Sequence, residues 1–118
     1  MNVTAKPTTS DLLSEIKEAD LHKVINLKIN GSINSYDIIV LNQNMPNLRS
    51  LDLTNAKIVA CDHEYYTGHK TSNDAIGDYM FYGQSKYLEI KLPKTVESIG
   101  NNAFCNCSSL TSVTIGNS

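Results

Sequence analysis

The sequence has no long hydrophobic run and no block of charges of one sign. Its longest apolar run covers residues 38–41, whereas a helix that crosses a membrane needs about 20 apolar residues. The 118 residues include 10 Lys or Arg and 12 Asp or Glu, which are scattered and give a formal net charge of −2. We therefore expect neither membrane insertion nor nucleic-acid binding.

Cysteine is scarce, and the common catalytic motifs are absent. Cys61, Cys105 and Cys107 are an odd number of cysteines without C-x-x-C spacing, so they predict neither a disulfide framework nor a zinc ribbon. No Gly-x-Ser-x-Gly turn, His-Glu-x-x-His helix or Gly-rich phosphate loop occurs. We expect no enzymatic activity and no cofactor, and we expect Cys107 to be a small buried residue rather than a reactive thiol.

The N-terminal residues lack the apolar region of a signal peptide. Residues 1–9 are polar and contain Pro7, so they predict a disordered leader. The protein is then either cytoplasmic or a secreted protein whose signal peptide is missing from this sequence. Ser10 is a suitable N-cap, and apolar residues follow at helical spacing up to Ala19. We predict an amphipathic capping helix over residues 10–20.

The next part of the chain predicts a strand, a helix and a second strand. Residues 24–29 alternate apolar and polar side chains, as a half-buried strand does. Ser35 is positioned to cap a short helix over residues 36–43. Residues 48–53 then repeat the pattern of residues 24–29. Parallel strands joined by such a helix form a βαβ unit, so the sequence predicts an α/β fold.

The C-terminal part contains one motif twice, with a constant offset of 23 residues. The identical pairs are Ile76/Ile99, Gly77/Gly100, Phe81/Phe104 and Ser85/Ser108. A fixed period of this length is typical of a solenoid, in which each unit buries its apolar face against the next. We expect the glycines to permit close stacking. The phenylalanines should form a buried aromatic spine, so that Phe104→Ala would cost about 3–5 kcal/mol.

Residues 60–75 interrupt the repeat with 16 additional residues. The segment is polar and lacks a period, so it predicts a loop on one face of the solenoid, where repeat proteins often bind their partners. Its candidate binding residues are His63, Tyr65, Tyr66 and His69. The two tyrosines are either exposed anchors or packed over the side of the solenoid. Cys61 and the two histidines do not match the spacing of a structural zinc site, so we predict no metal.

The outward face of the predicted sheet is a second candidate surface. Side chains between the inward apolar positions must face outward, and these include Lys28, Asp52, Glu89 and Lys91. Lys28, Asp52 and Lys91 alternate in sign, so opposite charges would lie side by side on neighbouring strands. The four residues are candidate partner contacts. The alternative is a solvated, charge-balanced face, because this surface lacks aromatic or Arg anchors.

Two stretches resemble BspA-like leucine-rich-repeat proteins, which are surface proteins of host-associated bacteria and some parasitic protists. One is Ile99-Gly100-x-x-Ala103-Phe104-x-x-Cys107-Ser108-Ser109-Leu110-x-x-Val113-x-Ile115, which matches the repeat itself. The other, residues 45–58, resembles the unit that opens such arrays. The resemblance covers roughly residues 20–118, although Gln84 and Tyr87 replace the usual Cys and Leu.

The resemblance implies a right-handed leucine-rich-repeat solenoid with a parallel β-sheet on its concave face and an N-terminal capping helix. Residues 10–118 would form one domain, with coils over residues 21–118, and would be the N-terminal part of a longer array. The resemblance also implies a cell-surface or extracellular protein with an adhesion-type role and no catalysis.

Two functions remain open from the sequence. The first is an interaction module that binds a protein or glycan partner, and the second is a structural spacer and cap for a longer array. Deletion of residues 60–75 would separate them, since a spacer should function without the loop. The last predicted strand would leave its outer edge open, so we also expect self-association through that C-terminal edge.

Overall fold

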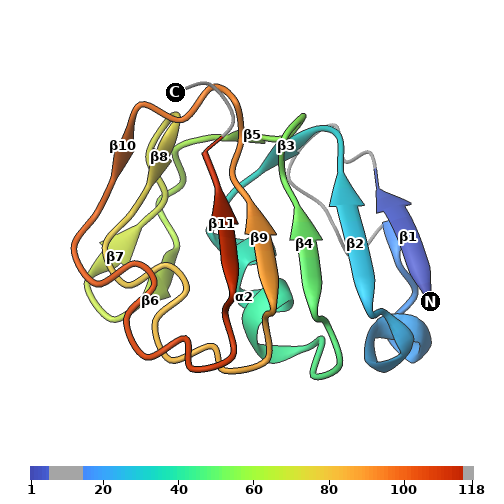
Figure 1. Cartoon of the computed structure of the whole chain (residues 1–118). Helices are drawn as coiled ribbons and strands as arrows, with labels where there is room; N and C mark the ends of the chain where they lie inside the picture. The colour runs from blue at the N-terminus through green and yellow to red at the C-terminus, as the bar shows by residue number, and fades with distance from the viewer. Residues whose placement is uncertain (6–14, 116–118) are drawn as a thin grey trace.

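The computed structural model describes residues 1–5 and 15–115 of the chain. A parallel five-stranded sheet with the strand order β1-β2-β4-β9-β11 forms its centre (Figure 1). Its strands are β1 (Asn2–Ala5), β2 (Asn26–Ile29), β4 (Ser50–Asp52), β9 (Glu89–Lys91) and β11 (Ser112–Thr114). None of the helices in the described part of the chain is long and apolar enough to cross a membrane.

Apolar side chains on one face of this sheet form the core. Leu27, Leu51 and Ile90 are paired in register on three neighbouring strands and are almost fully buried. A second buried row, at the ends of the same strands, is made by Ile29, Leu53 and Leu92. The predicted alternation and register are therefore confirmed for these strands. Large apolar side chains held in close contact supply the main driving force for folding.

The apolar residues of the last strand are more exposed than those of the inner strands. Val113 and Ile115 are 38% and 52% exposed, although the corresponding residues on β9 are buried. The reason is their position, because β11 forms the end of the sheet and has a neighbour on one side only. The exposure agrees with the expectation that the last predicted strand has an open edge.

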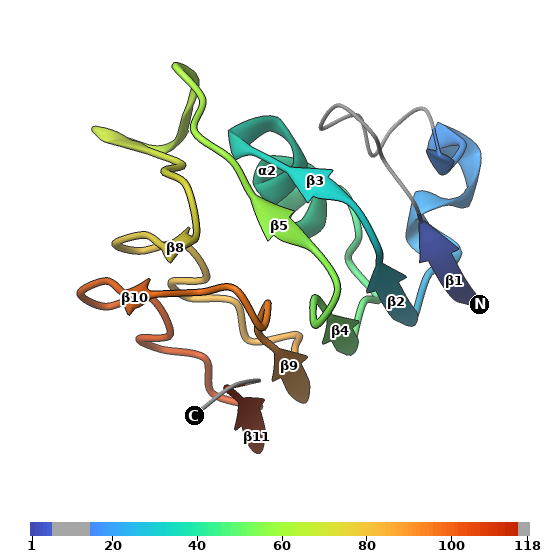
Figure 2. The same ribbon diagram turned by 90° about the horizontal axis from the view of Figure 1, so that it is seen from above.

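Two short parallel strand pairs lie outside the five-stranded sheet. They are β3 (Ser32–Ile33) with β5 (Lys57–Ile58), and β8 (Ala75–Ile76) with β10 (Ser98–Ile99). Figure 2 shows β2, β4 and β9 each leading through a turn into the short strand that follows it, β3, β5 and β10 respectively. The two 23-residue copies also pair through backbone bonds, in which the N–H groups of Tyr79, Phe81 and Gly83 donate to the carbonyl groups of Asn101, Ala103 and Cys105.

The N-terminal residues contradict the predicted leader. Asn2–Ala5 form β1, which pairs in parallel with β2, and Ala5 is buried. The Asn26 side-chain amide also donates a 2.6 Å hydrogen bond to Asn2 Oδ1. An unpaired edge of β2 would leave backbone groups without partners, which the five N-terminal residues satisfy. Residues 6–9 lie outside the described residues.

The predicted capping helix over residues 10–20 is only partly covered by the structure. Residues 10–14 lie outside the described residues. The extended backbone of Lys17 breaks a helix there, and a 3-10 helix, η1, runs over Glu18–Lys23. Leu21 is its buried residue, whereas Ala19 is exposed, contrary to the prediction. Leu21 and Val24 are three residues apart and both buried, which suits the three-residue turn of a 3-10 helix.

Helix α2 (Ser35–Gln43) lies behind β4 and β9 in the view of Figure 1. Its N-cap is Asn34, whose side chain accepts from the Tyr36 N–H, while Asp37 accepts from the Asn34 N–H in a capping box. The prediction of Ser35 as the cap is therefore wrong by one residue. The Ser35 hydroxyl instead contacts Thr71 of the 60–75 segment, at 3.2 Å.

Candidate functional site

Residues 60–75 contain a β-hairpin where the sequence predicted a loop. Strand β6 (Glu64–Tyr66) pairs with the antiparallel strand β7 (His69–Lys70), and Tyr66 lies opposite His69. Gly68 in the turn has a φ of 81°, a left-handed conformation that glycine adopts without strain. A two-residue turn of this kind brings the two strands together. We call residues 64–70 the hairpin.

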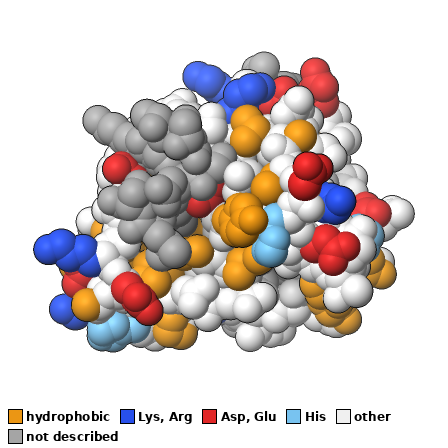
Figure 3. All heavy atoms as spheres, turned by 180° about the vertical axis from the view of Figure 1, so that it is seen from behind, with side chains coloured by type: hydrophobic (Ala, Val, Ile, Leu, Met, Phe, Trp, Pro, Cys, Tyr) orange, Lys and Arg blue, Asp and Glu red, His pale blue; other side chains and the backbone are white. Residues whose placement is uncertain are grey.

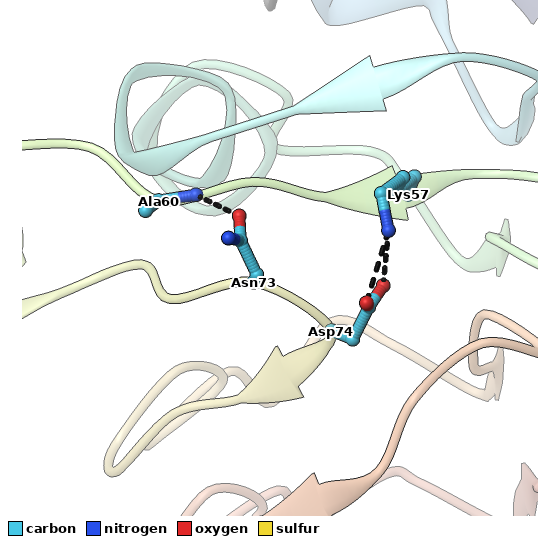
Figure 4. Close-up of polar contacts among 4 residues, drawn as sticks. All are labelled: Lys57, Ala60, Asn73 and Asp74. Atoms are coloured by element: carbon cyan, nitrogen blue, oxygen red, sulfur yellow. Dashed lines mark hydrogen bonds and ion pairs between the residues drawn. The ribbon is translucent and has the colours of Figure 1, made fainter.

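Polar contacts hold the base of the segment (Figure 4). The Lys57 ammonium group lies 2.8 and 2.9 Å from the two carboxylate oxygens of Asp74, and the Ala60 N–H donates to Asn73 Oδ1 at 2.9 Å. The hydrogen bond from Lys57 holds the pKa of Asp74 below its usual value. Both side chains are exposed to solvent, so this ion pair positions the chain more than it stabilises the fold.

Two buried side chains attach the hairpin to the core. Thr71 is 3% exposed. Its backbone N–H donates to Ser35 Oγ at 3.0 Å, and its hydroxyl donates to the Val59 carbonyl at 2.8 Å. Tyr65 is 7% exposed and donates to the Asp78 carbonyl at 2.6 Å. Burial, followed by the Asp78 charge, raises the pKa of Tyr65 to about 12. Of the two alternatives for Tyr65, packing is therefore the one that the structure shows.

The predicted role of the repeat glycines in close stacking is confirmed for Gly100, whereas Gly77 makes room for a side chain of the hairpin. A Cβ atom added to Gly77 would collide with the Tyr65 hydroxyl, and one added to Gly100 would collide with Asp78. The Asp78 carboxylate accepts from the Asn101 N–H at 2.7 Å at the same place. Close approach of neighbouring turns, with no room for a side chain, is what requires glycine here.

Four aromatic side chains meet beside the hairpin. We call them the tyrosine cluster, and its members are Tyr66, His69, Tyr79 and Tyr82. The Tyr66 and Tyr79 rings stack with centroids 5.2 Å apart and planes 6° apart, and Tyr82 meets Tyr79 edge-on at 5.3 Å. Tyr66 is 42% exposed. The sequence predicted Tyr66 and His69 as binding residues, and the structure places them together.

Tyr79 and Tyr82 were missed by the sequence prediction. They lie within the first 23-residue copy, at the positions that Asn102 and Cys105 occupy in the second. That departure from the repeat was the available signal. Because a repeat conserves its packing residues from copy to copy, an aromatic residue in one copy only indicates a local purpose.

The backbone of Tyr79 is unusual for an aromatic residue. Tyr79 has a φ of 60°, and Asn102 at the equivalent position has 57°. Gly83 and Asn106 are a second equivalent pair with positive φ, at 70° and 61°. The turn of the repeat thus requires a left-handed backbone conformation at these positions. Glycine and asparagine adopt this conformation readily, and tyrosine does not. Tyr79 is strained by about 1–2 kcal/mol.

His63 lies apart from His69. Its ring stacks on the exposed Tyr36 ring of α2, with centroids 4.2 Å apart and planes 8° apart. No group of three His, Cys, Asp or Glu side chains within residues 1–5 and 15–115 is arranged to hold a metal ion.

On the face seen in Figure 3, hydrophobic side chains gather near the middle beside a histidine, while charges of both signs are scattered.

The outward face of the five-stranded sheet carries the second set of predicted residues. Lys28, Asp52 and Lys91 lie in one row across β2, β4 and β9, and Lys91 is 3.7 Å from Glu89 on its own strand. Burial by itself would raise the pKa of Asp52. Hydrogen bonds from Thr54, together with the positive charges of Lys91 and Lys28, lower this pKa below its usual value. A shallow hollow of about 220 Å³ lies over β1, β2 and β4. With Glu89 included, this face carries two lysines and two carboxylates and is charge-balanced.

The repeat geometry agrees with a known family over the C-terminal part of the chain. Residues 74–118 match the BspA type Leucine rich repeat region (6 copies). No curated protein matches the chain. The match spans both 23-residue copies, including the stacked Phe81 and Phe104 rings, whose centroids are 5.6 Å apart. The family suggests a repeat solenoid, with which the parallel, in-register strands are consistent.

The two departures from the BspA-type pattern have different surroundings. Tyr87, which replaces a leucine, is fully buried and donates to the Leu41 carbonyl and to Asn42 Oδ1, at 3.2 and 3.1 Å. The neighbouring Lys86 donates to the carbonyl groups of Leu41, Asn42 and Met45. These bonds satisfy the C-terminal end of α2, whose last carbonyls lack partners within the helix. Nothing in the structure explains Gln84.

Cys107 is half-buried, whereas the sequence predicted a buried residue. Its thiol donates to the Phe81 carbonyl at 3.0 Å, and burial raises its pKa above the usual value. A raised pKa lowers the thiolate fraction, so Cys107 is less nucleophilic than a free cysteine. Its contact with the preceding copy gives it a packing role.

Proposed function

We propose that this chain is a non-enzymatic interaction module, formed by the first coils of a right-handed leucine-rich-repeat solenoid that binds a protein or glycan at the cell surface or outside the cell. The tyrosine cluster carries the proposal. It joins the hairpin to the first BspA-type copy and presents Tyr66 to solvent. Aromatic side chains provide large contact areas at a small entropic cost, and tyrosine is enriched in binding surfaces.

The strain at Tyr79 supports a binding role for the cluster. The turn forms with Asn102 in the second copy, so the backbone has no need of an aromatic residue at this position. Backbone strain that persists is concentrated at functional sites, where another interaction compensates for it. The stacking of Tyr79 against Tyr66 is that interaction within the chain, and it holds the Tyr66 ring in a fixed orientation.

The hairpin side is a better binding surface than the sheet. Lys28, Asp52, Glu89 and Lys91 carry two charges of each sign and have no aromatic residue among them, and the Lys91–Glu89 ion pair lies within one strand. Exposed ion pairs of this kind contribute about 0–1 kcal/mol each. We therefore place the partner at the tyrosine cluster, with the sheet residues at most adding long-range attraction.

A structural spacer is the alternative function. The buried anchors of the hairpin favour it, because Tyr65 and Thr71 show that this segment also covers the core. Deletion of residues 60–75 would remove both anchors and expose the apolar residues below. The deletion therefore does not separate binding from folding, and a point substitution at the surface is the better test.

The discriminating substitution is Tyr66→Ala. The full chain would be passed over a panel of immobilised, purified extracellular glycoproteins, and retention would be measured by surface plasmon resonance. An interaction module should bind at least one of them, and Tyr66→Ala should weaken that binding at least tenfold, as expected for an anchor worth about 1.4 kcal/mol or more.

Tyr36→Ala is the matched control, since Tyr36 is an exposed tyrosine that lies outside the tyrosine cluster. It should leave the binding unchanged. Circular dichroism would verify that both variants are folded. If the full chain binds nothing on the panel, or if both tyrosine variants bind as the unsubstituted chain does, the spacer function is the better account.

A further inference from the structure

A hollow lies between the hairpin and α2, next to the tyrosine cluster. It has a volume of about 370 Å³, within the range of small-molecule sites. Two faces form it. Its lining residues are Ile39 and Gln43 from α2, and Glu64, Tyr65, Tyr66 and Thr67 from the hairpin. Tyr66 therefore belongs to both features, and its stacking on Tyr79 fixes one wall of the hollow.

The lining combines an aromatic ring with free polar groups. The side chains of Gln43, Glu64 and Thr67 make no hydrogen bond to any other residue in ranges 1–5 and 15–115. They offer an amide that donates and accepts, a carboxylate that accepts, and a hydroxyl that does both. All three are exposed to solvent water. A ligand rich in hydroxyl groups could replace that water bond for bond.

The chemistry of this lining distinguishes between ligand classes. The face of a tyrosine ring is electron-rich and attracts the slightly positive C–H groups of a sugar ring, while the sugar hydroxyls meet the polar groups around it. Glu64 is the only charged residue of the lining, so an anionic sugar would be repelled. An apolar peptide side chain would leave the three polar groups without partners, which costs free energy.

We propose that this hollow binds a neutral hexose unit of a glycan, with Tyr66 stacking on the sugar ring and Gln43, Glu64 and Thr67 bonding to its hydroxyls. The proposal rests on the interaction function above and names its ligand class. A single hexose should bind with a dissociation constant on the order of millimolar, since it is a small ligand in an open site. A longer glycan would add contacts along the tyrosine cluster.

Titration of the full chain with simple sugars tests the proposal. Methyl glycosides of glucose, galactose and mannose, together with N-acetylglucosamine, would be added to ¹⁵N-labelled protein up to tens of millimolar. At least one of them should shift the amide signals of Gln43, Tyr66 and Thr67 in a saturable way. N-acetylneuraminic acid, which carries a carboxylate, should shift them at least tenfold more weakly.

Three variants separate the proposed contacts from folding. Tyr66→Ala should weaken sugar binding at least tenfold, while Tyr66→Phe keeps the ring and should retain it. Gln43→Ala replaces an exposed side chain without touching the core and should weaken binding severalfold. Tyr36→Ala, outside the hollow, should have no effect. The absence of saturable shifts with every neutral sugar, or shifts that persist in Tyr66→Ala, would overturn the proposal.

The glycoprotein panel keeps this proposal apart from the broader function. Each glycoprotein would be tested before and after enzymatic removal of its glycans. Binding that is lost on deglycosylation supports a glycan ligand. Binding that survives deglycosylation and still depends on Tyr66 shows a protein partner, which overturns the hexose proposal and leaves the interaction function standing.

Discussion

Phe81 and Phe104 occupy the same position of the repeat, yet their burial differs. Phe81 is fully buried and lies between Tyr87 and Phe104, whereas Phe104 is only partly buried. The expected aromatic spine is present, but Phe104 is covered on one side only. Position in the stack, as well as residue type, therefore determines how much each ring contributes to stability.

Phe81→Ala should lower the free energy of unfolding by about 3–5 kcal/mol, the usual cost of removing a buried phenylalanine. For Phe104→Ala the structure reduces the expected loss to about 2 kcal/mol, because part of that ring is already in water. Urea denaturation of both variants measures the difference. Equal losses for the two residues would contradict the burial seen here.

Tyr87 makes the stability of the fold sensitive to alkaline pH. Burial raises the pKa of Tyr87 above its ordinary value of 10.0, and that of Tyr65 to about 12. A raised pKa means that the folded state holds the proton more tightly than the unfolded state. The stabilisation is therefore complete below pH 10.0 and is lost as the pH rises above it.

Tyr87→Phe should reduce this alkaline loss. The variant keeps the ring and its edge-on contact with Phe81, but it lacks the hydroxyl that bonds to Leu41 and Asn42. Near neutral pH it should cost about 1 kcal/mol, while its stability should decline less steeply above pH 10.0. Unfolding free energies at several alkaline pH values check this. Lys86, whose pKa burial lowers to about 8, is present in both proteins and so cancels in the comparison.

The hairpin depends on tertiary contacts for its stability. Its own strands are short, and a two-stranded hairpin alone is marginally stable in water. Tyr65 and Thr71 connect it to the first BspA-type copy and to α2. The exposed Tyr66 and the hollow beside it depend on these anchors, since they hold the hairpin against the rest of the molecule.

Thr71→Val tests the anchor with little change of shape. The substitution removes a buried hydroxyl that bonds to the Val59 carbonyl and contacts Ser35. The Val59 carbonyl loses this bond, while Ser35 Oγ still accepts from the backbone N–H of residue 71. It should cost about 1–3 kcal/mol and speed amide hydrogen exchange in β6 and β7. Thr67→Val in the exposed turn of the same hairpin is the control and should change neither quantity. Unaltered exchange in Thr71→Val would show that the anchor is unimportant.

At the scale of the molecule, the described residues expose apolar groups at one end of the sheet. Val113 and Ile115 are exposed, and no strand within the described residues pairs with the outer edge of β11. Such an edge attracts another strand, because it offers backbone hydrogen bonds together with apolar surface. We propose that two copies of the chain associate through β11.

Sedimentation velocity over a wide concentration range should show reversible dimer formation. Val113→Lys places a charge on the edge strand and should weaken the dimer at least tenfold, as charges on natural edge strands prevent pairing. Asn26→Lys, on the outward face of β2, adds the same charge away from that edge and should have no effect. A strict monomer at the highest concentration would refute the association.

The sequence by itself determined the repeat and the identity of the inward residues. A period of 23 residues predicted the register of β9 with β11, since repeated units stack with equivalent residues side by side, and the alternating apolar pattern predicted the register of β4 with β9. The same reasoning predicted glycine at the close contacts of Gly77 and Gly100. These features depend on local pattern alone.

The tertiary structure decided which groups from distant segments meet. The sequence could not show that Asn2–Ala5 would pair with β2, because that pairing depends on an edge left free elsewhere. Nor could it distinguish the buried Tyr65 from the exposed Tyr66, or bring Tyr79 to the hairpin. Burial and stacking of this kind depend on how an irregular insertion packs against a regular repeat, and that packing carries no period that a sequence could reveal.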